Sequence, residues 1–281
     1  MRLAALMLVY FAAACAPRSS NQSPHHSDVI ANSVDTLRVD GRLVHIHLLG
    51  ISGPSVVLVS GLGDGFRPWS DVQPAVAEFA RVLSYDRLGL GQSEQGPAPR
   101  TVSRMTDELH ELLARTGLPA PYVIVGHSLG GFVAQLYAAR YPHDVRGLVL
   151  VDPSIAGFYV NAPSLPEWLV AMDQQKRMMA LAPPGVRAEL ESFDEDIAEM
   201  RGAPPIPRLP IVLLTSIHHR PPTPQPSPLD SVWLSEHQLW AREHPVTRHI
   251  VDTLHGHYLQ REVPTVVVNA IRSVVAERTR R

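Results

Sequence analysis

One serine in the sequence stands in a setting that would make it a nucleophile. Ser128 lies in the run Gly126-His127-Ser128-Leu129-Gly130, between an apolar segment at 122–125 and a segment of small and apolar residues at 129–140. A strand, then Gly-x-Ser-x-Gly, then a helix is the context of a nucleophile elbow, because a Cβ at either glycine would collide with the strand or the helix. Free N–H groups at the start of the helix can stabilise an oxyanion. Ser128 is therefore the candidate nucleophile.

A serine hydroxyl attacks a carbonyl only when a base takes its proton, and an acid must orient that base. The chain has 14 histidines and 27 acidic residues, so residue type alone leaves both partners open. They must come from elements that end at the same edge of the sheet as Ser128.

The segments around Ser128 predict such a sheet. Runs of β-branched and apolar residues indicate strands buried on both faces at 55–60, 81–85, 122–125, 147–151 and 209–215. Helical patterns alternate with them at 71–80, 102–116, 129–140, 231–243 and 264–277. Before them, Asp40-Gly41 between 36–39 and 43–49 predicts a hairpin. This alternation predicts an α/β fold with a mostly parallel, doubly wound sheet.

Residues 155–207 interrupt the alternation with helical patterns at 167–181 and 186–201. A connection of this length is much longer than the few residues that usually join a strand to a helix. We therefore predict a helical cap at 155–207, inserted into a core formed by residues 35–154 and 208–281. The acidic residues of the cap are interpreted as a solvated helix face, and they are Glu189, Glu191, Asp194, Glu195 and Asp196.

The elbow and further motifs resemble those of the α/β-hydrolase superfamily, over nearly all of residues 35–281. Ser60-Gly61-Leu62-Gly63-Asp64 stands where the family has its first oxyanion loop, with Ser60 in place of the histidine often found there. The resemblance implies that the backbone N–H groups of Leu62 and Leu129 form the oxyanion hole. Residues 85–93 are similar to the family's Asp-Arg-x-Gly-x-Gly-x-Ser loop, in which Asp86 would be a structural turn and salt-bridge residue.

The resemblance also implies positions for the base and the acid. Gly256-His257-Tyr258-Leu259-Gln260 is similar to the last-loop motif of the family, so His257 is the expected base and His255 is the alternative. The acid follows one of two strands. Asp152, directly after the strand at 147–151, is favoured, and Asp230 is the alternative. Both also have structural interpretations, Asp152 as a fold-supporting aspartate and Asp230 as the N-cap of a helix that starts near 231.

No cofactor or metal is predicted, because the sequence has no phosphate-cradling loop, dinucleotide fingerprint or paired metal ligands. The remaining histidines are expected in loops or on the surface, among them His45, His47, His218, His219, His237, His244 and His249.

A serine at the elbow argues against relatives that open epoxides with an aspartate there. We expect a carboxylesterase-like serine hydrolase that cleaves a small or medium ester through an acyl-enzyme on Ser128. An amidase, an aminopeptidase-like enzyme or a C–C bond hydrolase of the same superfamily shares these motifs and stays open. A non-catalytic ligand-binding surface protein also stays open as an alternative.

The composition agrees with one large globular domain. The chain has 281 residues, of which 45% are hydrophobic and 19% charged, and its formal net charge is −2. These values exclude the basic footprint of a nucleic-acid binder and the composition of a disordered chain.

The N-terminus predicts export. Leu3 to Ala14 form an apolar run that is too short to span a bilayer but fits a secretory signal. The small residues before Cys15, the single cysteine, resemble the lipobox of bacterial lipoproteins, although Ala12 stands where leucine is usual. We therefore expect a signal peptide at 1–14, a flexible tether at 15–34 and a membrane anchor on a lipidated Cys15. The protein would then reside in the bacterial cell envelope, or otherwise be secreted or periplasmic.

Overall fold

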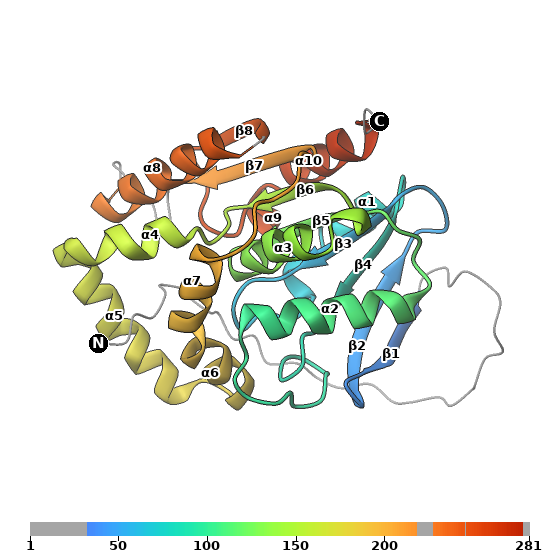
Figure 1. Cartoon of the computed structure of the whole chain (residues 1–281), viewed down its shortest axis with the longest axis horizontal. Coiled ribbons are helices and arrows are strands. Elements are labelled where there is room, and N and C mark those ends of the chain that lie inside the picture. Colours follow the sequence, from blue (N-terminus) through green and yellow to red (C-terminus); the bar gives the residue numbers. More distant parts are fainter. Residues whose placement is uncertain (1–32, 218–226, 245, 278–281) are drawn as a thin grey trace.

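The computed structural model describes residues 33–217, 227–244 and 246–277 (Figure 1). The predicted signal peptide, Cys15 and most of the predicted tether lie outside the described residues. The last two residues assigned to the tether, Ser33 and Val34, instead begin strand β1 (Ser33–Val39). Among the described residues, no helix combines the length and the apolar character that crossing a membrane requires.

The fold is built on one eight-stranded sheet in the order β1-β2-β4-β3-β5-β6-β7-β8. β2 pairs antiparallel with β1 and β4, and all other neighbouring pairs are parallel. The bounds are β2 (Arg42–Leu49), β3 (Ser55–Val59), β4 (Arg81–Tyr85), β5 (Tyr122–His127), β6 (Val145–Val151), β7 (Ile211–Ser216) and β8 (Val246–Asp252). This confirms the predicted α/β fold with its mostly parallel sheet.

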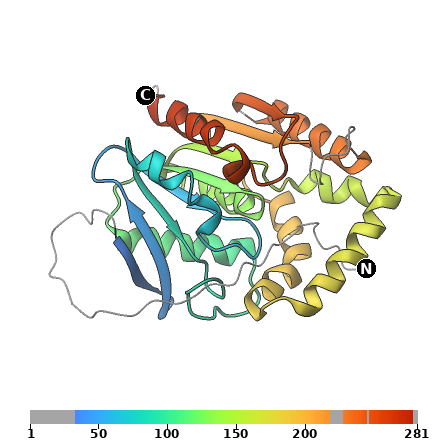
Figure 2. The ribbon, with the colours of Figure 1, turned by 180° about the vertical axis from the view of Figure 1, so that it is seen from behind.

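Helices cover both faces of the sheet, which explains the continuous apolar runs. On β3, Val57 and Val59 belong to one apolar cluster that also contains residues of α2 (Val102–Thr116), α3 (Leu129–Arg140) and α8 (Pro228–Glu243). Val56 and Leu58 point to the other layer, formed by α1 (Gln73–Ala77), α9 (Leu259–Glu262) and α10 (Pro264–Ala276). Figure 2 shows this second layer in front of the sheet. Because β3 to β8 run parallel, their carboxyl ends all lie at one edge of the sheet.

Two expectations about the elements were wrong. No strand was predicted at 246–252, yet β8 lies there. It is an edge strand that pairs only with β7, so it keeps exposed polar residues and lacks an apolar run. The single helix expected at 186–201 is two helices, α6 (Pro184–Glu191) and α7 (Phe193–Arg201). The helix is interrupted at Ser192, whose Oγ donates a hydrogen bond to Ala188 O at 2.9 Å.

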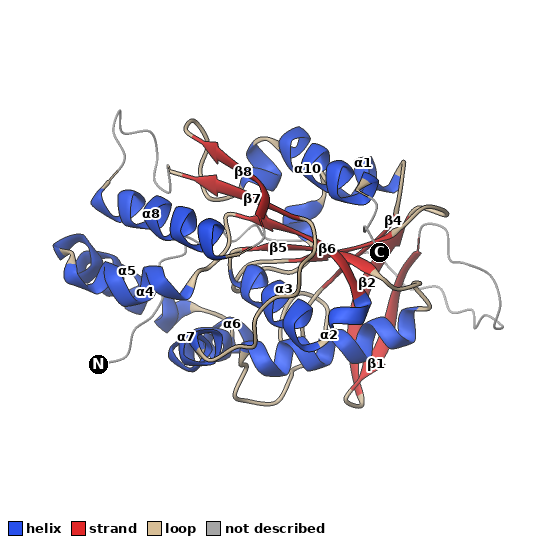
Figure 3. Ribbon diagram, turned by 45° about the horizontal axis from the view of Figure 1, so that its top comes forward, coloured by secondary structure: helices blue, strands red, loops and turns tan. Residues whose placement is uncertain are grey.

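The cap segment, residues 155–207, lies between β6 and β7. It contains α4 (Ala156–Asn161), which the sequence did not predict, then α5 (Pro166–Leu181), α6 and α7. In Figure 1 these helices lie together on the side to which the arrow of β7 points. Figure 3 shows α4 and α5 beside α8 of the core.

The cap segment is joined to the core by acidic side chains, one of them fully buried and one partly buried. Asp196 Oδ1 accepts a hydrogen bond of 2.6 Å from Val102 N, and Glu199 Oε2 accepts one of 2.9 Å from Ser103 N, both at the start of α2. Asp196 and Glu189 are fully buried. The interpretation of the acidic run as a solvated face was therefore wrong for these two residues. Burial raises the pKa of Asp196 to about 8, against the smaller effect of the Val102 hydrogen bond.

We expect Asp196→Asn to change how stability depends on pH. Because the folded-state pKa of Asp196 lies above its unfolded value near 4, the folded protein holds the proton more tightly. The wild type therefore loses free energy of unfolding as pH rises from about 4 to about 8. Asparagine keeps the acceptor for Val102 N but does not titrate. Between pH 5 and pH 9, the free energy of unfolding of the variant should rise relative to that of the wild type by on the order of 1 kcal/mol or more. Denaturant unfolding at several pH values measures this difference.

Glu195→Gln provides the matched control, because Glu195 is exposed on the same helix and the change removes the same charge. An Asp196→Asn stability difference that stays constant with pH, like that of the control, would contradict the assignment.

Candidate active site

The elbow between β5 and α3 has the strained backbone that its sequence predicts. Ser128 has φ 53° and ψ −118°, in a region that residues with a Cβ rarely adopt. A Cβ on Gly126 would lie 2.3 Å from Gly130 O, and one on Gly130 would lie 2.2 Å from Val59 O. Both glycines are therefore required by close backbone contacts.

Neighbouring backbone groups hold the strained residue in place. Ser128 N donates to Val151 O at 3.2 Å, at the end of the adjacent strand β6. Ser128 O accepts hydrogen bonds from Gly131 N at 2.8 Å and from Ser154 N at 2.9 Å. Ser128 is fully buried. The position of its side chain is therefore determined by the sheet, α3 and the chain after β6 together.

Asp152 and His257 meet directly. His257 Nδ1 lies 2.6 Å from Asp152 Oδ2, although the residues are 105 positions apart. The other oxygen, Oδ1, accepts hydrogen bonds of 2.8 Å from Ser216 N and from Trp233 Nε1. Asp152 follows β6 directly, is fully buried and has φ 43°. This geometry fits an acid that fixes the orientation and tautomer of a histidine.

The two alternatives have other partners. Asp230 Oδ2 accepts hydrogen bonds from Ser227 N at 2.8 Å and from Ser227 Oγ at 2.6 Å, in the capping box of α8. Ser227 is the N-cap and Asp230 stands three residues inside the helix, so the expected N-cap role of Asp230 was wrong. His255 Nδ1 lies 3.0 Å from Asp252 Oδ2, at the end of β8.

The loop that carries His257 is held against the elbow. His127 Nε2 lies 2.9 Å from His257 O, and the two rings are 4.6 Å apart between centroids. The next residue, Tyr258, donates from its OH to Asp64 Oδ2 at 3.1 Å, which links this loop to the loop after β3. Burial raises the pKa of Asp64 to about 6, although the Tyr258 hydrogen bond acts in the opposite direction.

The loop after β3 also lies against Ser128. A Cβ on Gly61 would lie 3.3 Å from Ser128 Cβ. Leu62 is buried, and Leu129 is the first residue of α3, where an N–H group has no carbonyl four residues earlier in the helix to bind. Ser60 Oγ, at the position of the missing family histidine, donates to Gly65 O at 2.7 Å and accepts from Trp69 Nε1 at 2.8 Å. Both expected oxyanion residues thus lie beside the elbow.

The expectation of loop or surface positions was wrong for several histidines. His45 is buried on β2, 3.1 Å from Asp86 Oδ2, while His47 on the same strand stacks on Phe66. His237 on α8 is buried, with Nδ1 2.7 Å from Thr215 Oγ1. His249 lies on β8, and His218 and His219 fall outside the described residues. Asp86 also accepts from Phe66 N and Gln92 N, as a structural turn residue should.

Sequence reasoning missed three residues that support this site. Trp233 and Ser216 bind Asp152, and no local pattern marks either of them. Glu189 reaches the loop after β3 from the cap segment, and its only signal was its place in the acidic run. Within the described part of the chain, no group of three or more histidine, cysteine, aspartate or glutamate residues is arranged to hold a metal ion.

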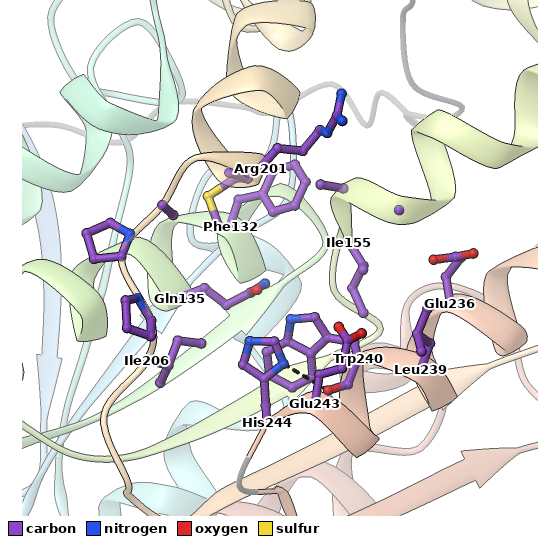
Figure 4. Close-up of a pocket in the computed structure, with 16 residues that line it drawn as sticks. Phe132, Gln135, Ile155, Arg201, Ile206, Glu236, Leu239, Trp240, Glu243 and His244 are labelled. Carbon is purple, nitrogen blue, oxygen red and sulfur yellow. Dashed lines mark hydrogen bonds between the residues drawn. The ribbon is translucent and has the colours of Figure 1, made fainter.

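A cavity of about 340 Å³ lies apart from the candidate catalytic residues (Figure 4). Phe132 and Gln135 of α3 and Trp240 of α8 line it, with the chain that leaves α7. Two of its polar side chains have partners within the protein. Glu236 Oε1 accepts from Asn161 Nδ2 at 2.7 Å, and His244 Nδ1 lies 2.9 Å from Trp240 O. Ser128, Asp152 and His257 are not among its lining residues.

Comparison with known proteins agrees with the fold. The family model described as alpha/beta hydrolase fold matches residues 54–190. The protein YqjL of Bacillus subtilis, named as uncharacterized, is 30% identical over 167 residues, which cover 59% of this chain and 63% of YqjL. The chain thus spans less than two thirds of the length of this relative, and of other curated relatives that it matches.

Solved structures share the whole architecture at low identity. An enol-lactonase from Burkholderia xenovorans has a TM-score of 0.60 and 19% identity, covering 86% of this chain and 100% of its own. The epoxide hydrolase CorEH has a TM-score of 0.62 and 19% identity, covering 87% and 98%. Together with the sheet order and the elbow between β5 and α3, these matches show that the chain has the α/β-hydrolase fold.

Proposed function

We propose that this protein is a serine hydrolase that cleaves small or medium carboxylic esters through an acyl-enzyme on Ser128. The observation that carries the proposal is the 2.6 Å contact between Asp152 Oδ2 and His257 Nδ1, in a loop held against the strained elbow. A serine at that elbow favours acyl transfer over epoxide opening, which uses an aspartate there.

The proposed mechanism divides proton transfer, nucleophilic attack and oxyanion stabilisation among these residues. His257 accepts the proton of Ser128 Oγ as that oxygen attacks the ester carbonyl, and Asp152 stabilises the imidazolium that forms. The N–H groups of Leu62 and Leu129 stabilise the negative oxygen of the tetrahedral intermediate. His257 then protonates the leaving alcohol. A water molecule, activated by the same histidine, attacks the acyl-enzyme and releases the acid.

A fluorophosphonate probe tests the nucleophile. The wild type should be labelled on Ser128, and Ser128→Ala should be neither labelled nor active, with a loss of at least about 10³-fold in the hydrolysis of p-nitrophenyl acyl esters. The same assay with matched acyl and aminoacyl amides tests the bond, and esters should be the better substrates. Folded wild-type protein that resists the probe, or that prefers amides, would refute the proposal.

The acid is tested by a matched pair of variants. Asp152→Asn removes the charge beside His257 and should lower kcat/KM for the ester by about 10³- to 10⁴-fold. Asp230→Asn makes the same change at the capping box of α8, so it should leave kcat/KM within a few fold while costing about 1 kcal/mol of stability. Similar activity losses in both variants would exclude Asp152 as the acid.

We further propose that the protein is exported and anchored in the bacterial cell envelope by lipid on Cys15, as its N-terminal sequence suggests. A single acyl chain binds a membrane only reversibly, so firm attachment requires the multiple chains of a lipoprotein. Cys15→Ser should therefore move the protein from the membrane pellet to the soluble envelope fraction. A wild type that stays soluble after fractionation would contradict the anchor.

A further inference from the structure

Arg87 and Glu189 form a buried ion pair that the proposed chemistry does not use. Arg87 lies on the loop after β4, and Glu189 lies on α6 of the cap segment. Arg87 Nε lies 2.7 Å from Glu189 Oε1, and Arg87 Nη2 lies 2.9 Å from Glu189 Oε2. The exposed fractions are 3% for Arg87 and 0% for Glu189. Because burying two charges is costly, such a pair is kept where its geometry matters.

The same two side chains hold the loop after β3. Arg87 Nη1 donates to Ser60 O at 2.6 Å, and Arg87 Nη2 donates to Gly61 O at 2.7 Å. Glu189 Oε2 accepts a hydrogen bond of 2.8 Å from Gly63 N. Three consecutive peptide units, from residue 60 to residue 63, are therefore held by one ion pair.

This clamp sets the direction of the expected oxyanion donor. A peptide unit is planar and trans, so the N–H of Leu62 points away from the C=O of Gly61 in the same unit. By binding Gly61 O, Arg87 turns the Leu62 N–H away from itself. By binding Gly63 N, Glu189 fixes the orientation of the next peptide unit, between residues 62 and 63. The N–H of Gly63 is then occupied and does not point into the active site.

Backbone packing adds to the coupling between α6 and the loops. A Cβ on Gly63, which has φ 72°, would lie 2.9 Å from Val186 Cγ1 of α6. A Cβ on Gly185 would lie 1.9 Å from Gly89 O, on the loop that carries Arg87. Helix α6 therefore cannot shift without disturbing these loops.

We propose that Glu189 is a positioning residue for the oxyanion hole: through Arg87 and Gly63 N it orients the Leu62 amide, so that the hole is complete only while cap helix α6 is docked. The inference rests on the proposed ester hydrolysis and extends it by making the cap part of the catalytic machinery. It assigns to a cap residue a function in transition-state stabilisation.

Glu189→Gln tests the inference, because glutamine keeps the shape and one acceptor but loses the charge that holds Arg87. A misaligned oxyanion donor affects the transition state more than the ground state. We expect kcat for ester hydrolysis to fall about 10- to 100-fold, while KM stays within about 3-fold. Affinity for a trifluoromethyl ketone, whose adduct with Ser128 carries an oxyanion, should fall in parallel, and affinity for a product carboxylic acid should not.

Amide hydrogen exchange provides a readout that needs no turnover. The peptide covering residues 60–65 should exchange faster in Glu189→Gln than in the wild type. Glu108→Gln is the matched control, since Glu108 on α2 pairs with buried Arg100 through two hydrogen bonds of 2.6 and 2.7 Å, and neither residue makes a hydrogen bond to residues 60–63. It should lose stability while kcat, ketone affinity and exchange at 60–65 stay at wild-type values.

The outcomes separate the two proposals. A wild type that neither turns over esters nor reacts with the fluorophosphonate overturns the proposed function and this inference with it. An active wild type whose Glu189→Gln variant keeps its kcat, its ketone affinity and its exchange at 60–65 overturns only the positioning role. Equal losses in Glu108→Gln would also overturn it, by showing a general effect of destabilisation.

Discussion

A carboxylate enclosed by protein is tolerated only when hydrogen-bond donors surround it, and this requirement organises the centre of the molecule. Asp152 receives donors from the end of β7 through Ser216, from α8 through Trp233 and from the last loop through His257. These elements are far apart in the sequence. Each must reach its place before the charge is satisfied, so the same contacts that stabilise the fold also orient the histidine.

Backbone strain is concentrated at the same edge of the sheet. Ser128 and Asp152 have positive φ, and each directly follows a central parallel strand, β5 or β6. Hydrogen bonds between the two chain segments, from Ser128 N to Val151 O and from Ser154 N to Ser128 O, hold the strained residues together. Such conformations persist only where the surroundings enforce them, and here two rigid strands project a hydroxyl and a carboxylate from one edge.

The cap segment makes contacts that stabilise the core, in addition to lying over one edge of the sheet. Its two fully buried acidic residues bind groups of the core. Asp196 accepts a hydrogen bond from the first amide of α2, and Glu189 pairs with Arg87 and accepts a hydrogen bond from Gly63 N. These two side chains are committed to contacts with the core. The shared fold alone does not choose among ester, epoxide and other chemistries, since these depend on the residues grafted onto it.

What the sequence determined by itself was local. The apolar runs predicted the strands from β3 to β7, the glycines around Ser128 predicted the elbow, and the resemblance placed His257 and Asp152. The strands and the elbow depend on neighbours along the chain, which periodicity and spacing record. Edge strand β8, the break at Ser192 and the buried roles of His45, His237 and Glu189 were decided only by tertiary structure. The partners of β8 and of these three side chains lie tens of residues away, and whether a polar side chain is solvated or buried depends on which distant group meets it.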